Sequence, residues 1–181
     1  MAELERAAHF REGHIFDGAT VRRDLWQLLR IYLSERPFTE FTQHELYRDG
    51  WDQPLIGLDS EFSEYEVTRI LLNTAVSLRV IDDRDGGVLE RFDACGELVP
   101  EVGRAETQPL SLREACNKIL HADRINYDVD RLDGGDVRQA GLWPMFMNPT
   151  IYLYGTLRGR PWKATLDVMA FVRGGAGAVP G

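Results

Sequence analysis

Three polar side chains of the types that cleave phosphodiester bonds follow one another along a helical stretch of the sequence. Arg113, Asn117 and His121 stand four residues apart, so they turn only about 80° around a helix axis and share one polar stripe. A guanidinium can stabilise the charge of a phosphorane, an amide can orient the substrate, and an imidazole can transfer a proton. Metal-free cleavage of RNA requires these parts, so we take the three residues as candidate catalytic residues.

The helix that presents this stripe is predicted to span residues 111 to 121. A capping box of Ser111 and Glu114 opens it. Apolar residues then recur at i, i+3, i+4 and i+7, namely Leu112, Ala115, Cys116 and Ile119. This pattern predicts that Cys116 is a buried, reduced thiol. In a purely structural alternative, the polar stripe is a solvated face, and His121 lies near the helix C-terminus because a cation is favoured there.

Residues 116 to 121, Cys-Asn-Lys-Ile-Leu-His, resemble the end of the HEPN motif, in which an Arg, a polar residue and a His lie close together on an all-helical scaffold. Asn117 and His121 match the polar and His positions, whereas Cys116 stands at the Arg position and Arg113 lies farther from the His. The resemblance implies a dimeric, metal-independent ribonuclease, or a degenerate relative that binds RNA or a protein partner. In either case it implies that His121 is the acid and base, and that Arg113 is a substitute anion-binding residue.

A second hypothesis is a non-enzymatic protein-interaction module. Its candidate surface is an apolar cluster at residues 143 to 147, which contains Trp143, Met145, Phe146 and Met147. Methionine and aromatic side chains suit adaptable interfaces. The alternative role of this cluster is to cover the core.

A winged-helix arrangement is one form that such a module could take. It would use helices at 20–35, 42–49 and 63–78, followed by a wing at 79–93. The recognition helix would then begin with Glu64 and Glu66, and the wing tip would be Asp-Arg-Asp at residues 83 to 85. Acidic residues at both contacts would face phosphates unfavourably, so duplex DNA is not an expected partner.

The charge of the chain limits its partners. The 181 residues include 21 Lys and Arg against 29 Asp and Glu, a formal net charge of −8. This charge repels nucleic acid and anionic membranes, so RNA would need a local basic patch. Residues 151 to 181, the only basic region, hold Arg158, Arg160, Lys163 and Arg173 against Asp167. No apolar stretch reaches the roughly 20 residues that span a bilayer, and the N-terminus lacks a secretory signal, so we expect a cytoplasmic protein.

No metal or cofactor is expected. Two groups of histidines and carboxylates lie outside the polar stripe, and neither has a compact ligand motif. They are His9 and His14 near Asp17, and the acidic turn with Asp82, Asp83 and Asp85. Cys95 and Cys116 are too far apart for a Cys-x-x-Cys site and predict neither a structural zinc nor a disulfide framework.

The spacing of apolar residues predicts a single α+β domain over residues 1 to 181. Residues 1–125 are expected to form a mainly helical body of three to four helices, at 20–35, 42–49, 63–81 and 111–121, with a small hairpin at 79–93. Two β-rich runs with a turn between them predict a C-terminal β-hairpin within 149–173. The remaining stretches are expected to be a loop at 96–110, an irregular connection at 127–148 and a flexible Gly/Ala tail at 174–181.

Overall fold

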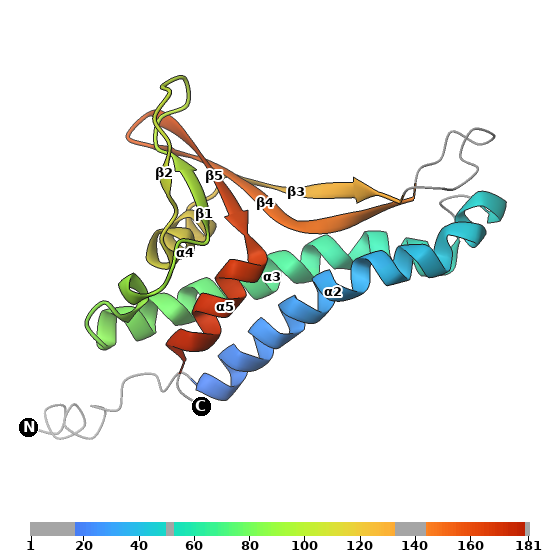
Figure 1. Ribbon diagram of the computed structural model, residues 1–181, viewed down its shortest axis with the longest axis horizontal. Helices are drawn as coiled ribbons and strands as arrows, with labels where there is room; N and C mark the ends of the chain where they lie inside the picture. Colours follow the sequence, from blue (N-terminus) through green and yellow to red (C-terminus); the bar gives the residue numbers. More distant parts are fainter. Residues whose placement is uncertain (1–16, 50–52, 133–143, 180–181) are drawn as a thin grey trace, which may run out of the picture.

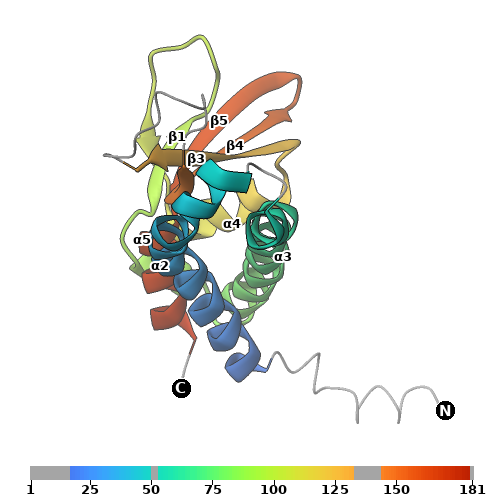
Figure 2. The ribbon, with the colours of Figure 1, turned by 90° about the vertical axis from the view of Figure 1, so that its right-hand side faces the viewer.

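The computed structural model describes residues 17–49, 53–132 and 144–179. Helices form one layer and a five-stranded antiparallel sheet forms the other (Figure 1, Figure 2). The strand order is β2-β1-β5-β4-β3. This arrangement confirms the predicted α+β class. The helices cover one face of the sheet, and no described element covers the other face.

Two long helices, α2 (Gly18–Asp49) and α3 (Pro54–Arg84), form the base of the helical layer. The sequence predicted that a first helix ends before Pro37 and that a second follows, which is wrong, because α2 continues through Pro37. Proline removes one backbone hydrogen bond, but buried side chains on both sides of it, Tyr32 and Leu46, hold α2 against the rest of the structure. Among the described helices, none is both long enough and apolar enough to cross a membrane.

The hairpin predicted at 79–93 does not form. Instead α3 continues to Arg84, and a short 3-10 helix, η2 (Val88–Arg91), follows. Asp82 lies inside α3 without exposed surface, and its carboxylate accepts a hydrogen bond of 2.8 Å from the Leu89 N–H. The start of the acidic run therefore stays helical, because the carboxylate of its first residue, Asp82, is buried with partners. The wing of the winged-helix hypothesis is absent from this described stretch.

The predicted C-terminal hairpin is confirmed as β4 (Met145–Leu157) and β5 (Arg160–Asp167). Arg158 and Gly159 form its turn with positive φ angles of 52° and 79°, as two-residue hairpin turns require. The second strand ends earlier than predicted, because the Asp167 carboxylate caps the next helix by accepting a 3.0 Å hydrogen bond from Ala170 N–H.

Three strands were not predicted. β1 (Gly96–Val99) and β2 (Gln108–Pro109) lie in the stretch expected to be a loop, and β3 (Arg124–Arg131) begins just before the expected irregular connection. Their alternation of apolar and polar residues is short or interrupted by a bulge. These strands are therefore defined by pairing, of β2 with β1, of β1 with β5 and of β3 with β4, rather than by local sequence. The rest of that connection, residues 133–143, lies outside the described residues.

The helix α4 (Leu112–Leu120) confirms the predicted helix, whereas α5 (Val168–Ala178) replaces the first part of the expected flexible tail. Gly174 and Gly175 are buried inside α5. A Cβ at Gly174 would lie 3.0 Å from Leu112 Cδ2, and one at Gly175 would lie 3.1 Å from Leu25 Cδ2. The small residues therefore allow close packing of this helix, and reading them as a sign of flexibility was wrong.

Candidate functional site

Arg113 points away from the other two residues of the predicted site. Its guanidinium pairs with two carboxylates of α3, where Nη1 contacts Asp82 Oδ2 and Nη2 lies 3.1 Å from Asp83 Oδ1. Asp82 is fully buried, so its charge requires such a partner. Arg113 therefore neutralises a buried carboxylate, and the structure does not bring it into the pocket that His121 lines.

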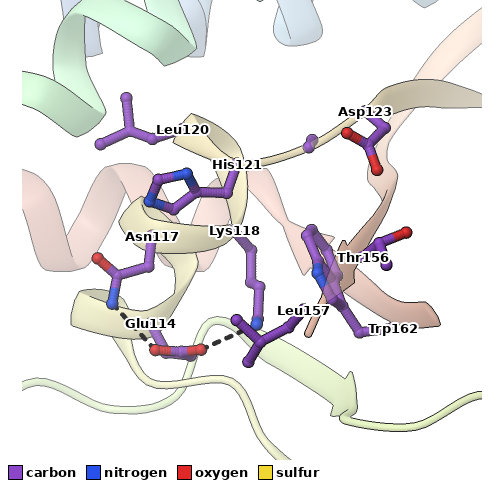
Figure 3. Close-up of a pocket in the computed structure, with 10 residues that line it drawn as sticks. Glu114, Asn117, Lys118, Leu120, His121, Asp123, Thr156, Leu157 and Trp162 are labelled. Carbon is purple, nitrogen blue, oxygen red and sulfur yellow. Dashed lines mark hydrogen bonds and ion pairs between the residues drawn. The ribbon is translucent and has the colours of Figure 1, made fainter. Parts of the chain in front are cut away.

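Asn117 and His121 line the same pocket, a hollow of about 700 Å³ between the C-terminal end of α4 and the β4–β5 hairpin (Figure 3). His121 ends α4, and its backbone N–H donates to Asn117 O at 3.1 Å. The spacing of four residues places both side chains on one side of the helix, as Figure 3 shows. The amide and the imidazole therefore share one side of α4, as predicted, and line one pocket that Arg113 does not line.

Glu114 holds the other polar groups on this side of the pocket. Its carboxylate accepts a 3.0 Å hydrogen bond from Asn117 Nδ2 and pairs with Lys118 Nζ at 3.1 Å. The Lys118 ammonium also lies 4.4 Å from the centroid of the Trp162 ring. Among the described residues that line the pocket, Lys118 and His121 are the basic side chains, against the carboxylates of Glu114 and Asp123. This lining suits a small polar group better than an extended polyanion.

Gly155 lets the end of α4 approach the sheet. It pairs with Trp162 across the hairpin. A Cβ at this position would lie 2.3 Å from Trp162 Cζ2 and 2.8 Å from His121 O, and both distances are too short for real contacts. The missing side chain therefore fixes how close the His121 backbone lies to β4, and with it the floor of the pocket.

Cys116, which stands at the arginine position of the HEPN motif, is a buried free thiol, as predicted. Burial raises the pKa of its side chain to about 12. A thiol held neutral in this way neither attacks a substrate nor replaces a guanidinium.

The apolar cluster at residues 143–147 is only partly described, because Trp143 lies outside the described residues. Pro144 and Met147 are buried, and Met145 is 43% exposed. The Met147 N–H donates a 3.1 Å hydrogen bond to the Glu35 carboxylate of α2. The described part of this cluster therefore mainly joins the sheet to α2.

A group that the sequence interpretation missed lies on the uncovered face of the sheet, and we name it the aromatic-cation cluster. It consists of Arg124, Tyr152, Tyr154 and Lys163. The strand register sets Tyr154 between Arg124 on β3 and Lys163 on β5. Arg124 Cζ lies 4.4 Å from the centroid of the Tyr154 ring, and Lys163 Nζ lies 4.6 Å from that of Tyr152. Two rings and two cations thus meet on one face of the sheet.

The aromatic-cation cluster has an acidic neighbour at one end and the Asp123 backbone at the other. Toward the start of β4, Asn148 Nδ2 donates to Asp128 at 2.9 Å and to Asp130 at 3.2 Å. Toward the end of β4, the Asp123 N–H donates to Tyr154 O at 2.8 Å, and Asp123 also lines the pocket. Asp123 therefore connects the two regions through the backbone, but the pocket lies on the helical side of the sheet, where Lys118 packs on Trp162, and the cluster lies on the outer face.

Alternation along the strands was the one signal that could have revealed the cluster. Tyr152 and Tyr154 alternate with the buried Ile151 and Leu153, which places both rings on the outer face. No comparable signal existed for Arg124, because β3 was not predicted.

Among the residues that the structure describes, no group of three or more His, Cys, Asp or Glu side chains could hold a metal ion. Comparisons with protein families, with curated proteins and with solved structures find no match for this chain.

Proposed function

We propose that the protein binds single-stranded RNA on the outer face of its sheet. The observation that supports this most directly is the aromatic-cation cluster, in which Tyr152 and Tyr154 each have a cation over the ring. Aromatic rings on an open sheet stack with unpaired bases, and neighbouring Arg and Lys side chains pair with the phosphates. On binding, each base takes the place of a cation on a ring, and the cation moves to a phosphate.

The spacing of the rings suits separate bases. Residues two apart on a strand are about 7 Å apart, so Tyr152 and Tyr154 can each stack with one base. The partial HEPN resemblance at Asn117 and His121 supports RNA as the ligand, although α4 here packs beside a sheet and not within an all-helical scaffold.

The surrounding charges limit the length of the bound RNA. Asp128 and Asp130 lie beyond the cluster on β3, and the whole chain has a net charge of −8. Only a short segment therefore avoids repulsion. Two phosphate contacts, one at Arg124 and one at Lys163, predict that the logarithm of affinity falls with that of salt concentration with a slope of about 1.4.

Fluorescence anisotropy with a labelled oligouridine tests this proposal. Changing both Tyr152→Ala and Tyr154→Ala should weaken binding by about 10- to 100-fold, because two stacking partners are lost. Replacing the same residues by Phe should preserve most of the affinity, since the rings remain. Phe146→Ala, on the same strand beside the acidic end, is the matched control and should bind as wild type does. Equal binding by wild type and the double alanine variant would contradict the proposal.

The pocket supports a second candidate function, cleavage of the bound RNA. His121 and Asn117 share a pocket on the helical side of the sheet, and Asp123 joins it to Tyr154 through a backbone hydrogen bond, so a bound strand must leave the outer face to reach it. In this reaction the neutral His121 imidazole takes the proton of a ribose 2′-hydroxyl while O2′ attacks phosphorus. The bond to O5′ breaks, and the departing oxygen takes a proton from the imidazolium or from water. Lys118 is the cation that can stabilise the phosphorane charge, once it leaves Glu114.

Cleavage and binding can be separated in one experiment. If the pocket cleaves RNA, His121→Ala should lower turnover by about 10²- to 10⁴-fold and leave oligouridine binding unchanged. Lys118→Gln should lower turnover as well, whereas Arg113→Ala should affect stability only. Wild-type protein that binds oligouridine without cleaving it would reject the ribonuclease and retain the binding function.

A further inference from the structure

The side of α3 that faces away from the core is apolar along its length. Large hydrophobic side chains recur there every three or four residues, and each exposes between 38% and 67% of its surface. We call this set the α3 stripe, and it comprises Leu55, Leu58, Phe62, Tyr65, Leu72, Val76 and Val80. Arg69 occupies the one interruption. The buried residues of α3 lie on the opposite side, and Figure 2 shows α3 at an edge of the helical layer.

The length and spacing of the α3 stripe fit another long helix. Alternating spacings of three and four residues are those by which two helices pack side by side. From Leu55 to Val80 the stripe extends about 38 Å, too long for a small ligand. Its exposed apolar area is roughly 600 Å², more than monomers usually expose in a patch and close to the ~800 Å² that each partner buries in a stable complex.

The α3 stripe is self-complementary about Arg69. Phe62 and Val76 lie seven residues before and after Arg69, and Leu58 and Val80 lie eleven, so each pair joins a larger side chain with a smaller one. Tyr65, four residues before Arg69, and Leu72, three after it, form a third such pair with an offset of one residue. An antiparallel second copy would set these pairs opposite each other and fill the contact evenly. A parallel copy would oppose Phe62 to Phe62 and Val76 to Val76, which leaves a clash at one place and a gap at another.

The charges beside the α3 stripe fit the same arrangement. The Arg69 guanidinium is paired with Glu66, with Nε 2.8 Å from Oε2 and Nη2 2.6 Å from Oε1, so the centre of the contact holds no bare charge. Glu61 and Arg79 are 18 residues, about five turns, apart and thus lie on one flank of the stripe. They stand at similar distances on either side of Arg69, so an antiparallel copy brings opposite charges together. The Arg79 side chain is only 20% exposed and already lies 3.9 Å from Asp82 and 3.3 Å from Asp83, which makes this pair a modest addition.

We infer that α3 binds a second copy of this chain, antiparallel and centred on Arg69, to form a symmetric dimer. The α3 stripe and the aromatic-cation cluster share no residue, although Tyr65 and Leu72 line one pocket with Arg124, so the dimer is tested by its own measurement.

Sedimentation of purified protein tests the inference. Phe62→Glu should weaken the dimer at least about 100-fold, since the symmetric contact buries two copies of the new charge. Val76→Lys should have a similar effect. The double variant with both changes should regain most of the affinity, because an antiparallel partner sets the new carboxylate opposite the new ammonium.

Phe41→Glu is the matched control. Phe41 is 69% exposed on α2, outside the α3 stripe, so this change should leave the dimer intact. Circular dichroism must show that each variant is folded. Wild-type protein that is monomeric at roughly 100 µM overturns the inference. So does a dimer that survives Phe62→Glu, and a double variant weaker than both single variants excludes the antiparallel arrangement.

A covalent test locates the centre of the contact. Arg69→Cys should give a disulfide-linked dimer under mild oxidation, whereas Phe41→Cys should not. The native Cys95 and Cys116 are buried and do not interfere. Absence of the linked dimer from the Arg69→Cys protein would contradict a centre at this residue.

Discussion

The outer face of the sheet and the outer side of α3 are both uncovered by described elements, yet their chemistry differs. Tyrosine hydroxyls and the charges of Arg124 and Lys163 make the sheet face polar, and its rings are partly exposed. The α3 stripe consists mostly of hydrocarbon side chains with large exposed fractions. The first surface keeps its affinity for water and suits a charged ligand, whereas the second gains most by excluding water. An uncovered surface therefore indicates a partner only through the chemistry of its side chains.

Both faces can be altered without loss of the fold. The largest effect on the free energy of unfolding should therefore come from a contact inside the structure, that of Arg113 on α4 with Asp82 on α3. Arg113→Ala leaves the buried Asp82 carboxylate without its main partner and should lower the free energy of unfolding by about 3–5 kcal/mol. Denaturant titration measures this change. Arg104→Ala removes an exposed ion pair with Glu101 and should cost less than about 1 kcal/mol. If Arg113→Ala lowered the free energy of unfolding no more than Arg104→Ala, the contact with Asp82 would not be needed for stability.

Two neighbouring leucines on α3 sharpen the contrast between core and stripe. Leu71 is fully buried and Leu72 is 38% exposed. Leu71→Ala should destabilise the monomer by about 2–5 kcal/mol, because it leaves a cavity in the core. Leu72→Ala should change the monomer by less than about 1 kcal/mol and weaken the dimer instead. Urea melts at low protein concentration measure the stability of the monomer, and sedimentation measures the dimer. If Leu72→Ala destabilised the monomer more than Leu71→Ala, the assignment of both faces of α3 would be wrong.

The covered face of the sheet should respond to pH through Glu35. Burial raises the pKa of this carboxyl to about 7, with a smaller contribution from Asp59. The folded state then holds a proton that the unfolded state loses near pH 4.5, so stability falls by up to about 3 kcal/mol as pH rises from 4.5 to 7 and is level above that. Glu35→Gln should remove this slope, and the exposed Glu40→Gln should retain it. Unfolding measurements from pH 4.5 to 8 test this prediction. If stability depended on pH in the same way in wild type, Glu35→Gln and Glu40→Gln, the assignment to Glu35 would be contradicted.

Salt should affect the two outer faces in different ways. Raising the salt concentration from 50 to 200 mM should weaken oligouridine binding about sevenfold, because two phosphate contacts release counterions. The dimer should change less than about twofold, since its contact is mainly apolar. Anisotropy and sedimentation in the same buffers give both numbers. A dimer as salt-sensitive as RNA binding would mean that charges, not the α3 stripe, hold it together.

Local signals predicted the elements that local contacts define. The capping serine and apolar stripe of α4 specify that helix almost to the residue, and the Arg158–Gly159 turn specifies the C-terminal hairpin. By contrast, α2 passes through Pro37 and α5 contains glycines because contacts from distant segments stabilise them. A sequence pattern cannot supply such contacts.

The site follows the same rule. Asn117 and His121 were predicted together because helix spacing alone places them on one side of α4. Arg113 was misplaced because its partner Asp83 lies 30 residues earlier in the chain. The aromatic-cation cluster requires the register of β3, β4 and β5, which only the folded sheet fixes.

The close contact at Gly155 also provides a way to recognise other chains with this pocket. Since any side chain there would collide with Trp162 and with the His121 carbonyl, the glycine and the tryptophan depend on each other. Both lie within one hairpin, in the stretch Gly-Thr-Leu-Arg-Gly-Arg-Pro-Trp from Gly155 to Trp162. A glycine followed seven residues later by a tryptophan, and preceded by an Asn-x-x-x-His helix, is therefore the written signature of this pocket. A chain with this fold and with the same glycine and tryptophan should have the same approach of helix to strand.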